Sequence, residues 1–226
     1  MTTVAILQCR MGSIRLPGKS LLPLLGVPMV QQIVERVQRA SRVDRVVVAY
    51  PLADAPAFQF LADTGCSLYA YPGDESDLVG RYVLAAAAYD AEVIVRVPCD
   101  NPCIDPMYVD EAIQTYAEHP FIYYSNTTAA VGRTWVDGIG AEVLSMSRLQ
   151  WLDQRTKGTP YLREHPHRYF EECGLLRLPR ADVRLDVNTA EDYALIQSIY
   201  QHVGHNRFAS AEVLEYLAML SMPVSD

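Results

Sequence analysis

The sequence predicts an α/β fold, a mostly parallel twisted sheet with helices on both faces. Short apolar runs, one of them nearly all valine, alternate along the chain with longer segments in which apolar residues recur at helical spacing. The runs are apolar at almost every position, as expected of parallel strands that are covered on both faces. Strand, helix and strand in this order form the crossover connections of a parallel sheet.

The first half of the chain contains the clearest elements. We expect strands at 4–7, 45–50, 66–71 and 92–97, and helices at 28–40, 58–64 and 78–89. In such sheets, ligands bind beyond the carboxyl ends of the strands. The loop after the first strand is basic and the loop after the fourth is acidic. We therefore expect these two loops to converge at one edge of the sheet.

The second half is expected to extend the sheet and cover it. Helices are predicted at 106–118, 147–154, 160–165 and 209–220, and strands at 121–124, 135–144, 175–178 and 183–187. Asp105 precedes Pro106 and should cap the helix that begins there. Thr189 and Asp192 have the spacing of a capping box, which predicts another helix directly after Thr189.

Composition limits the possible functions. A chain of 226 residues fits a single domain over 1–226. The formal net charge of -8 argues against a nucleic-acid partner or a membrane surface, because both need a basic face. Charges interrupt every apolar stretch before the roughly 20 residues of a membrane helix. Five scattered cysteines predict reduced thiols rather than a zinc site. We therefore expect a cytoplasmic protein, and we find no signal-peptide pattern.

Residues 9–20 give the strongest functional signal. They include Gly12, Gly18 and three cations, Arg10, Arg15 and Lys19, and no acidic residue. Main-chain N–H groups near glycines, backed by Arg and Lys, are suited to a polyphosphate. We therefore interpret this range, called the clamp loop below, as a binding loop for a nucleoside triphosphate. The alternative is a surface turn with solvated cations.

The clamp loop is not a Walker A motif. That motif has four residues between its first glycine and Gly-Lys-Ser, whereas five residues separate Gly12 from Gly18. A helix should also follow the Lys-Ser pair, but Pro23 would interrupt its first turns. We therefore expect a different phosphate-binding geometry.

A family resemblance begins in the clamp loop. The run from Gln8 to Lys19, followed by Leu21-Leu22-Pro23-Leu24 and Gly26-Val27-Pro28-Met29, resembles the cytidylyltransferases that activate acidic sugars as CMP derivatives. The similarity is greatest to SpsF-type enzymes, and the acylneuraminate and 3-deoxy-manno-octulosonate enzymes are more distant. The resemblance covers most of the chain. It implies a nucleotide-diphospho-sugar transferase architecture (GT-A or Rossmann-like), CTP and a small acidic acceptor as substrates, and a homodimer formed through an acceptor and dimerisation lobe at about 134–172.

Two carboxylates are expected to hold Mg²⁺. Asp100 follows the fourth strand, and a carboxylate fixed there can bind Mg²⁺ together with substrate phosphates. The resemblance implies the same role, although Cys99 stands where the family usually has glycine. The family commonly has Asp directly before the residue that corresponds to Thr189. This chain has Asn188 at that position and keeps Asp186, so we expect Asp186 to be the second metal ligand.

The resemblance also implies catalytic and nucleotide-binding residues. Arg10, Lys19 and Asp100 are expected to be catalytic, because the two cations can stabilise charge on the phosphate oxygens. Arg81 matches the family pattern Asp-x-x-x-Arg-Tyr, and its alternative role is that of a surface arginine. The expected nucleotide-binding residues are Gln8, Arg10, Gly12, Ser13, Lys19 and Arg81.

The residues expected to form the acceptor pocket match the family patterns Ser-Asn and Asp-Gly-x-x-x-Glu-Val. Its expected residues are Asn126, Arg133, Asp137 and Glu142. The range 155–161 lacks the Glu-His pair of SpsF-like enzymes, so the sequence does not identify the acceptor. A phosphonate, a phosphorylated small molecule or another NTP are alternative substrates. A nucleotide-binding protein that has lost catalysis is a further alternative, favoured only by Asn188 and by the missing pair.

Overall fold

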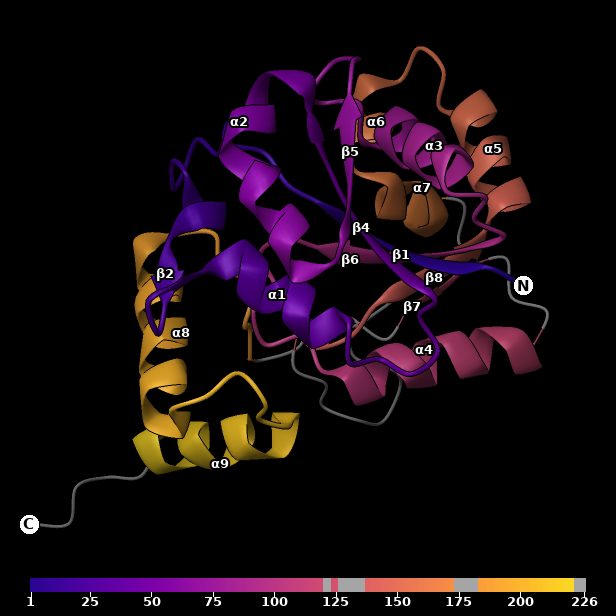
Figure 1. Cartoon of the computed structure of the whole chain (residues 1–226). Coiled ribbons are helices and arrows are strands. Elements are labelled where there is room, and N and C mark those ends of the chain that lie inside the picture. Colours follow the sequence, from indigo (N-terminus) through magenta and orange to yellow (C-terminus); the bar gives the residue numbers. More distant parts are fainter. Residues whose placement is uncertain (120–122, 126–136, 173–182, 222–226) are drawn as a thin grey trace, which may run out of the picture.

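The structure, a computed structural model, describes residues 1–119, 123–125, 137–172 and 183–221. Within them, a six-stranded sheet has the order β5-β4-β1-β6-β8-β7 (Figure 1). The strands are β1 (Thr3–Gln8), β4 (Arg45–Pro51), β5 (Ser67–Tyr71), β6 (Val93–Pro98), β7 (Tyr124–Ser125) and β8 (Glu142–Ser145). Strands β5, β4, β1 and β6 are parallel, and β8 is antiparallel to β6 and β7. The predicted α/β fold is confirmed.

Helices cover both faces of the sheet because the side chains of each strand alternate between the faces. In β1, Ala5 and Leu7 belong to one core cluster, and Val4 and Ile6 belong to the other. The first cluster is completed by α1 (Met29–Val37), α2 (Ala55–Phe58), η3 (Gln59–Thr64), α4 (Pro106–Glu118), α8 (Ala190–Val203) and α9 (Ser210–Ser221). The second is completed by α3 (Leu78–Ala88), α5 (Met146–Arg155) and α7 (Pro166–Glu172). The short helix α6 (Pro160–Glu164) contacts α3.

The four parallel strands end at one edge of the sheet, called the carboxyl edge below. β1 leads into the clamp loop, and β4 leads into the 3-10 helix η2 (Leu52–Asp54). β5 leads into a turn at 72–77, and Asp100 follows β6 closely. Because the strands share one direction, these four connections lie at the same end of the sheet. This is the edge where the sequence predicts ligand binding.

The clamp loop ends in short elements rather than in a long helix. Lys19 begins the 3-10 helix η1 (Lys19–Leu21), and a small antiparallel hairpin of β2 (Pro23–Leu24) and β3 (Val27–Pro28) follows. This local structure agrees with the rejection of a Walker A motif. The hairpin was not predicted, since strands of two residues are too short to produce a recognisable periodicity.

The predicted strand at 183–187 is wrong. Its only pairing in the described residues is an isolated bridge between Asp137 and Arg184. The amides of this segment instead bond to loops: Leu185 N–H donates to Asp137 O at 3.0 Å, and Val187 N–H donates to Asp100 O at 2.8 Å. The apolar run is thus explained by burial of Leu185 and Val187 under loops of the carboxyl edge. The predicted strand at 175–178 lies outside the described residues.

Both predicted helix caps are confirmed. The Asp105 carboxylate caps α4 by accepting from Met107 N–H at 3.0 Å. Thr189 and Asp192 form the capping box of α8. The box sets the start of α8 at Ala190, and the Asp192 carboxylate also accepts from Asn188 N–H at 2.9 Å, which positions the end of the segment that approaches the carboxyl edge. Among the described residues, no helix combines the length and the apolar character that a membrane crossing requires.

Candidate active site

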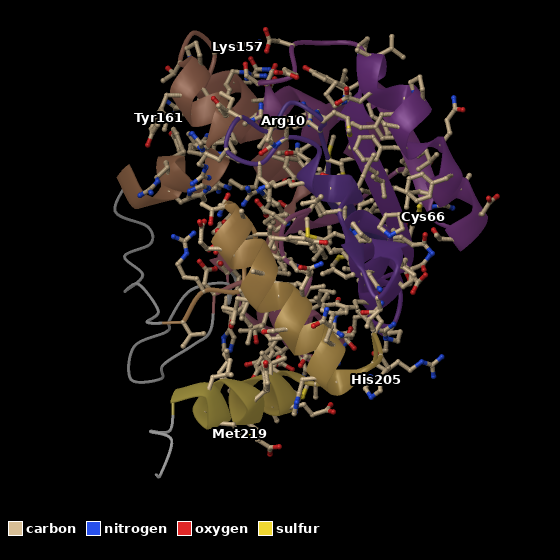
Figure 2. All side chains as sticks on the ribbon, turned by 90° about the vertical axis from the view of Figure 1, so that its left-hand side faces the viewer. Arg10, Cys66, Lys157, Tyr161, His205 and Met219 are labelled. Carbon is tan, nitrogen blue, oxygen red and sulfur yellow. A yellow bond between two sulfur atoms is a disulfide. The ribbon has the colours of Figure 1, made fainter. Side chains whose placement is uncertain are left out.

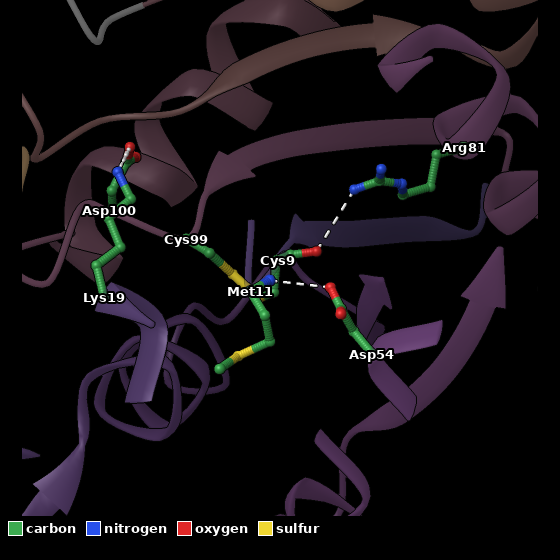
Figure 3. Close-up of a disulfide and its surroundings, with 7 residues drawn as sticks. All are labelled: Cys9, Met11, Lys19, Asp54, Arg81, Cys99 and Asp100. Carbon is green, nitrogen blue, oxygen red and sulfur yellow. Dashed lines mark hydrogen bonds and ion pairs between the residues drawn. A yellow bond between two sulfur atoms is a disulfide. The ribbon is translucent and has the colours of Figure 1, made fainter. Parts of the chain in front are cut away.

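Lys19 and Asp100 meet at the carboxyl edge (Figure 3). The Lys19 ammonium donates to Asp100 Oδ2 and to the main-chain oxygen of Val187, each at 2.8 Å. The two side chains are only 15% and 26% exposed. The basic loop after β1 and the acidic loop after β6 therefore converge, as the sequence predicts. Their contact holds a cation at a fixed position between the two loops.

Asp186 is connected to this pair through Asn188. The Arg184 guanidinium makes two hydrogen bonds to Asp186, of 3.0 and 2.6 Å, and the Asn188 amide donates to the same carboxylate. Asn188 Oδ1 accepts from Arg15 at 2.7 Å and from Lys19 at 3.4 Å. Asn188 thus joins two cations of the clamp loop to the second predicted metal ligand.

The charges of Asp186 and Asp100 both affect the pKa of Asp137. Burial, together with the charges of Asp186 and Asp100, raises the pKa of Asp137 to about 6. The main chain fixes its position, because Asp137 N–H donates to Val183 O at 3.0 Å. Of the two expected acceptor residues that the structure describes, Asp137 and Glu142, Asp137 is therefore the one near the predicted metal ligands.

Gly138 allows the main chain to approach this closely. Its φ is +94°, and a Cβ atom at this position would lie 3.0 Å from the carbonyl carbon of Leu185. A side chain would be strained by the positive φ and would push against the backbone next to Asp186. The glycine thus keeps Asp137 and the 183–188 segment together.

The acids fit a magnesium ion that is bound jointly with a triphosphate. In the part of the chain that the structure describes, no three His, Cys, Asp or Glu side chains are placed to hold a metal ion by themselves. Mg²⁺ typically takes one or two protein carboxylates plus substrate phosphates. Burial is the first cause of the raised pKa of Asp137, and the charge of Asp186 adds to it, while Arg184 acts in the opposite direction. This donor set suits a small divalent cation, and the roles of Asp100 and Asp186 as its ligands stay predictions.

Acidic residues from three other segments lie next to the clamp loop. Arg10 Nη2 lies 3.5 Å from Glu164 Oε1 of α6, and Figure 2 shows Arg10 on the side of the molecule where α6 carries Tyr161. Met11 N–H donates to Asp54 Oδ2 at 2.9 Å (Figure 3). A Cβ atom on Gly12 would lie 3.1 Å from Glu75 Oε2, so the glycine permits this close approach. These three acidic side chains therefore lie beside the loop that the sequence predicts to bind phosphate groups.

Two expected nucleotide-binding residues support the main chain around the clamp loop. The Gln8 amide donates to Leu78 O at 3.0 Å, at the start of α3. Arg81 is 1% exposed, and its guanidinium donates to Cys9 O and Glu75 O. The alternative of a surface arginine is therefore wrong for Arg81. It connects the clamp loop to the turn 72–77, and its direct contact with a nucleotide stays a prediction.

The remaining expected residues are not all brought together. The Glu142 carboxylate forms a buried ion pair with Arg96, between β8 and β6. Although burial raises the pKa of Glu142, the Arg96 charge lowers it overall. Because the ion pair with Arg96 already engages the Glu142 carboxylate inside the sheet, its acceptor role stays a prediction. Asn126 and Arg133 lie outside the described residues. Ser13 contacts the main chain of the clamp loop, where its N–H donates to Met11 O at 2.9 Å.

The prediction of reduced thiols is wrong for two cysteines. Cys9 and Cys99 form a disulfide with a Cα–Cα distance of 5.5 Å (Figure 3). Their positions explain the pairing, since each follows a strand and β1 and β6 are neighbours in register. The disulfide connects the residue before Arg10 to the residue before Asp100. Cys66 and Cys103 are free thiols.

We expect this disulfide to be detectable in the purified protein. When the chain is unfolded without a reductant and treated with an alkylating reagent, Cys66 and Cys103 should be modified and Cys9 and Cys99 should not. Peptide mapping by mass spectrometry checks this. A control with reductant should modify all five cysteines of the chain, and modification of Cys9 and Cys99 without reductant would contradict the pairing.

The sequence pattern does not indicate several residues that shape the site. Asp54 could have been found, since it follows β4 at the edge where parallel strands end. Glu164 and Arg163 gave no local signal, because their partners Arg10 and Asp77 are 154 and 86 residues away in the chain. Such contacts depend on tertiary structure that the sequence pattern does not encode locally.

Comparisons with known proteins identify the family of this chain. A family model described as cytidylyltransferase matches residues 4–222. The spore coat polysaccharide biosynthesis protein SpsF of Bacillus subtilis is 31% identical, over 92% of this chain and 90% of its own. A cytidylyltransferase structure from Leptospira borgpetersenii superposes with a TM-score of 0.84, at 27% identity and with 100% of both chains covered.

A more distant structure has the same fold. The CMP:2-keto-3-deoxy-manno-octonic acid synthetase complexed with CTP has a TM-score of 0.69 at 19% identity, with 89% of this chain and 99% of its own covered. The expected nucleotide-sugar transferase-like architecture and the resemblance to the SpsF-type enzymes are both confirmed. With a family model that spans nearly the whole sequence and a site that joins its basic and acidic loops, this chain belongs to the cytidylyltransferase family of enzymes.

Proposed function

We propose that this enzyme transfers CMP from CTP to an acidic sugar or a related small acid in a Mg²⁺-dependent reaction that releases pyrophosphate. The observation that carries the proposal is the contact between Lys19 and Asp100 at the carboxyl edge. It joins a cation suited to a triphosphate and a carboxylate suited to Mg²⁺ in a chain of the cytidylyltransferase family. The fold of a synthetase complexed with CTP supports the choice of nucleotide.

In the proposed reaction, an acceptor oxygen attacks the α-phosphorus of CTP. The bond between the α-phosphorus and the oxygen bridging to the β-phosphorus breaks, and that oxygen leaves with pyrophosphate. Lys19 and Arg10 stabilise negative charge on the phosphate oxygens, and Ser13 and the N–H groups around Gly12 hold the β- and γ-phosphates. Because Lys19 is already fixed by Asp100 and Val187, its charge is in place before the substrate arrives.

Asp100 and Asp186 would hold Mg²⁺ at the carboxyl edge. When bound, Mg²⁺ neutralises triphosphate charge and favours in-line attack. Arg184 and Asn188 orient the Asp186 carboxylate through their hydrogen bonds. Asn188 itself carries no charge, so in this proposal it positions Asp186 and Lys19 rather than replacing a carboxylate.

The acceptor is proposed to bind beside Asp137, with Asn126, Arg133 and Glu142 as the other expected contacts. We place it there because the short segment 185–187, which includes Asp186, bonds to the main-chain oxygens of both Asp137 and Asp100. The segment 134–172 is proposed to form the acceptor and dimerisation lobe of a single domain, in a cytoplasmic homodimer. The similarity to SpsF supports a role in polysaccharide biosynthesis.

A pyrophosphate-release assay tests the proposal. The purified enzyme is incubated with each of the four NTPs, with candidate sugar acids and small acids, and with or without Mg²⁺. We expect release only with CTP, Mg²⁺ and an acidic acceptor together. Release with another NTP would contradict the choice of base. Tight binding of CTP without turnover for any acceptor would support the alternative of a protein that has lost catalysis.

A further inference from the structure

The helix α6 contacts the nucleotide edge through two consecutive residues of opposite charge. Arg163 reaches Asp77 at the start of α3, and Glu164 reaches Arg10 in the clamp loop. Both contacts connect α6 to segments that are far away in the sequence. The contact of Arg163 is shorter and less exposed than that of Glu164. The two residues should therefore affect nucleotide binding differently.

The contact of Arg163 is the stronger one. Its guanidinium makes two hydrogen bonds of 2.9 Å to the two oxygens of Asp77, and an ion pair of 2.9 Å to Asp153 of α5. Arg163 is 16% exposed. A planar guanidinium that binds a carboxylate at two points is both strong and directional. Although burial raises the pKa of Asp77, the bonds from Arg163 and Gly80 N–H lower it overall.

Asp77 transmits this restraint to the clamp loop. It caps α3 by accepting from Gly80 N–H at 2.8 Å and also accepts from the Tyr71 hydroxyl at 3.2 Å. One turn later in α3, the buried Arg81 donates to Cys9 O and Glu75 O. Arg163 therefore fixes the turn 72–77 and, through α3, the start of the clamp loop.

The contact of Glu164 is weaker and more exposed. Glu164 Oε1 is 3.5 Å from Arg10 Nη2, and both side chains are 35% exposed. In the proposed function, Arg10 contacts a phosphate of CTP. A carboxylate that occupies Arg10 competes with that phosphate for the same guanidinium, and its charge repels a triphosphate nearby.

We propose that α6 controls the nucleotide affinity of the enzyme: Arg163 is a positioning residue that holds the 72–77 turn through Asp77, and Glu164 is a competitor that occupies Arg10 until a triphosphate replaces it. This inference rests on the proposed function, because it assigns Arg10 to the nucleotide. The two residues then act in opposite directions. Removing Arg163 should weaken nucleotide binding, and removing the charge of Glu164 should strengthen it.

Titration calorimetry with CTP and Mg²⁺, without an acceptor, tests the proposal. We expect Glu164→Gln to lower the Kd about two- to fivefold, the range for a single exposed ion pair. Arg163→Gln should raise the Kd about tenfold, because it removes a two-point contact. Matched controls carry the same charge changes elsewhere: Glu118→Gln at the end of α4, and Arg45→Gln at the start of β4, both exposed and neither at the carboxyl edge.

A double variant tests whether Arg163 acts through Asp77. Asn caps a helix as well as Asp does, so Asp77→Asn removes the charge partner and keeps the cap. If Arg163 acts through Asp77, the Arg163→Gln, Asp77→Asn double variant should bind CTP no more weakly than the Arg163→Gln variant. A general loss of stability would instead move the melting temperature without a specific change of Kd in the folded protein.

The possible outcomes are distinct. Opposite shifts of Kd for the two α6 variants, with unchanged controls, support the proposal. Shifts in the same direction, or an effect of Glu164→Gln no larger than that of Glu118→Gln, overturn it while the proposed function stands. If the wild-type chain binds no CTP in the presence of Mg²⁺, the proposed function fails and this inference fails with it.

Discussion

Replacing Lys19 with alanine is expected to lower kcat/KM for CTP at least about a hundredfold, the usual loss for a pre-oriented charge stabiliser. The ammonium is held at 2.8 Å from both Asp100 Oδ2 and Val187 O. It therefore needs no reorganisation when charge develops on the phosphate. The pyrophosphate-release assay at varied CTP and saturating acceptor measures this loss.

The chain provides a matched control for this substitution. Its other lysine, Lys157, is exposed and contacts Gln154. Lys157→Ala removes the same group and should leave kcat/KM near the wild-type value. Near-normal kinetics of the Lys19→Ala variant, with folding confirmed by circular dichroism, would show that the clamp loop does not bind the reacting phosphate.

Replacing Asp100 with asparagine is expected to reduce kcat at least about a hundredfold, equivalent to about 2.7 kcal/mol of transition-state stabilisation. Asparagine keeps the shape of the side chain and can still accept from Lys19, but it removes the charge that would hold Mg²⁺ against the triphosphate. The loss should therefore be accompanied by a higher Mg²⁺ concentration at half-maximal rate. Steady-state rates at varied Mg²⁺ measure both effects.

Asp63→Asn is the matched control for this second substitution. Asp63 is exposed in η3, which precedes β5 and so lies at the opposite edge of the sheet. The Asp63→Asn variant loses the same charge at a position away from the site, so its steady-state rates should equal those of the wild type. If Asp100→Asn kept its full rate and its Mg²⁺ dependence, the metal site would have to be placed elsewhere.

The sequence predicts the parts of the site whose position depends on where a strand ends. The apolar runs located β1 and β6, and the residues after them were expected at one edge because parallel strands end together. The contact of Lys19 with Asp100 follows from this rule. The capping box at Thr189 was equally local, since both of its members lie within one helical turn.

The failures have a common physical cause. The run 183–187 reads as a strand, but its amides bond to Asp137 O and Asp100 O, partners that periodicity does not reveal. The spacing of the cysteines predicts reduced thiols, although the register of β1 and β6 places Cys9 and Cys99 side by side. Arg81 was a candidate surface residue, and its burial depends on two carbonyl groups of distant loops. In each case a tertiary contact decides the outcome.

The central claim is that the clamp loop and the acidic loop after β6 bind one metal-bound triphosphate between them. A crystal soaked with CTP and Mn²⁺, a substitute for Mg²⁺ with a measurable anomalous signal, tests it most directly. We predict an anomalous peak between the Asp100 carboxylate and the triphosphate, with the Lys19 ammonium in contact with a phosphate oxygen. A triphosphate bound away from both side chains, or a metal peak far from Asp100, would contradict the account.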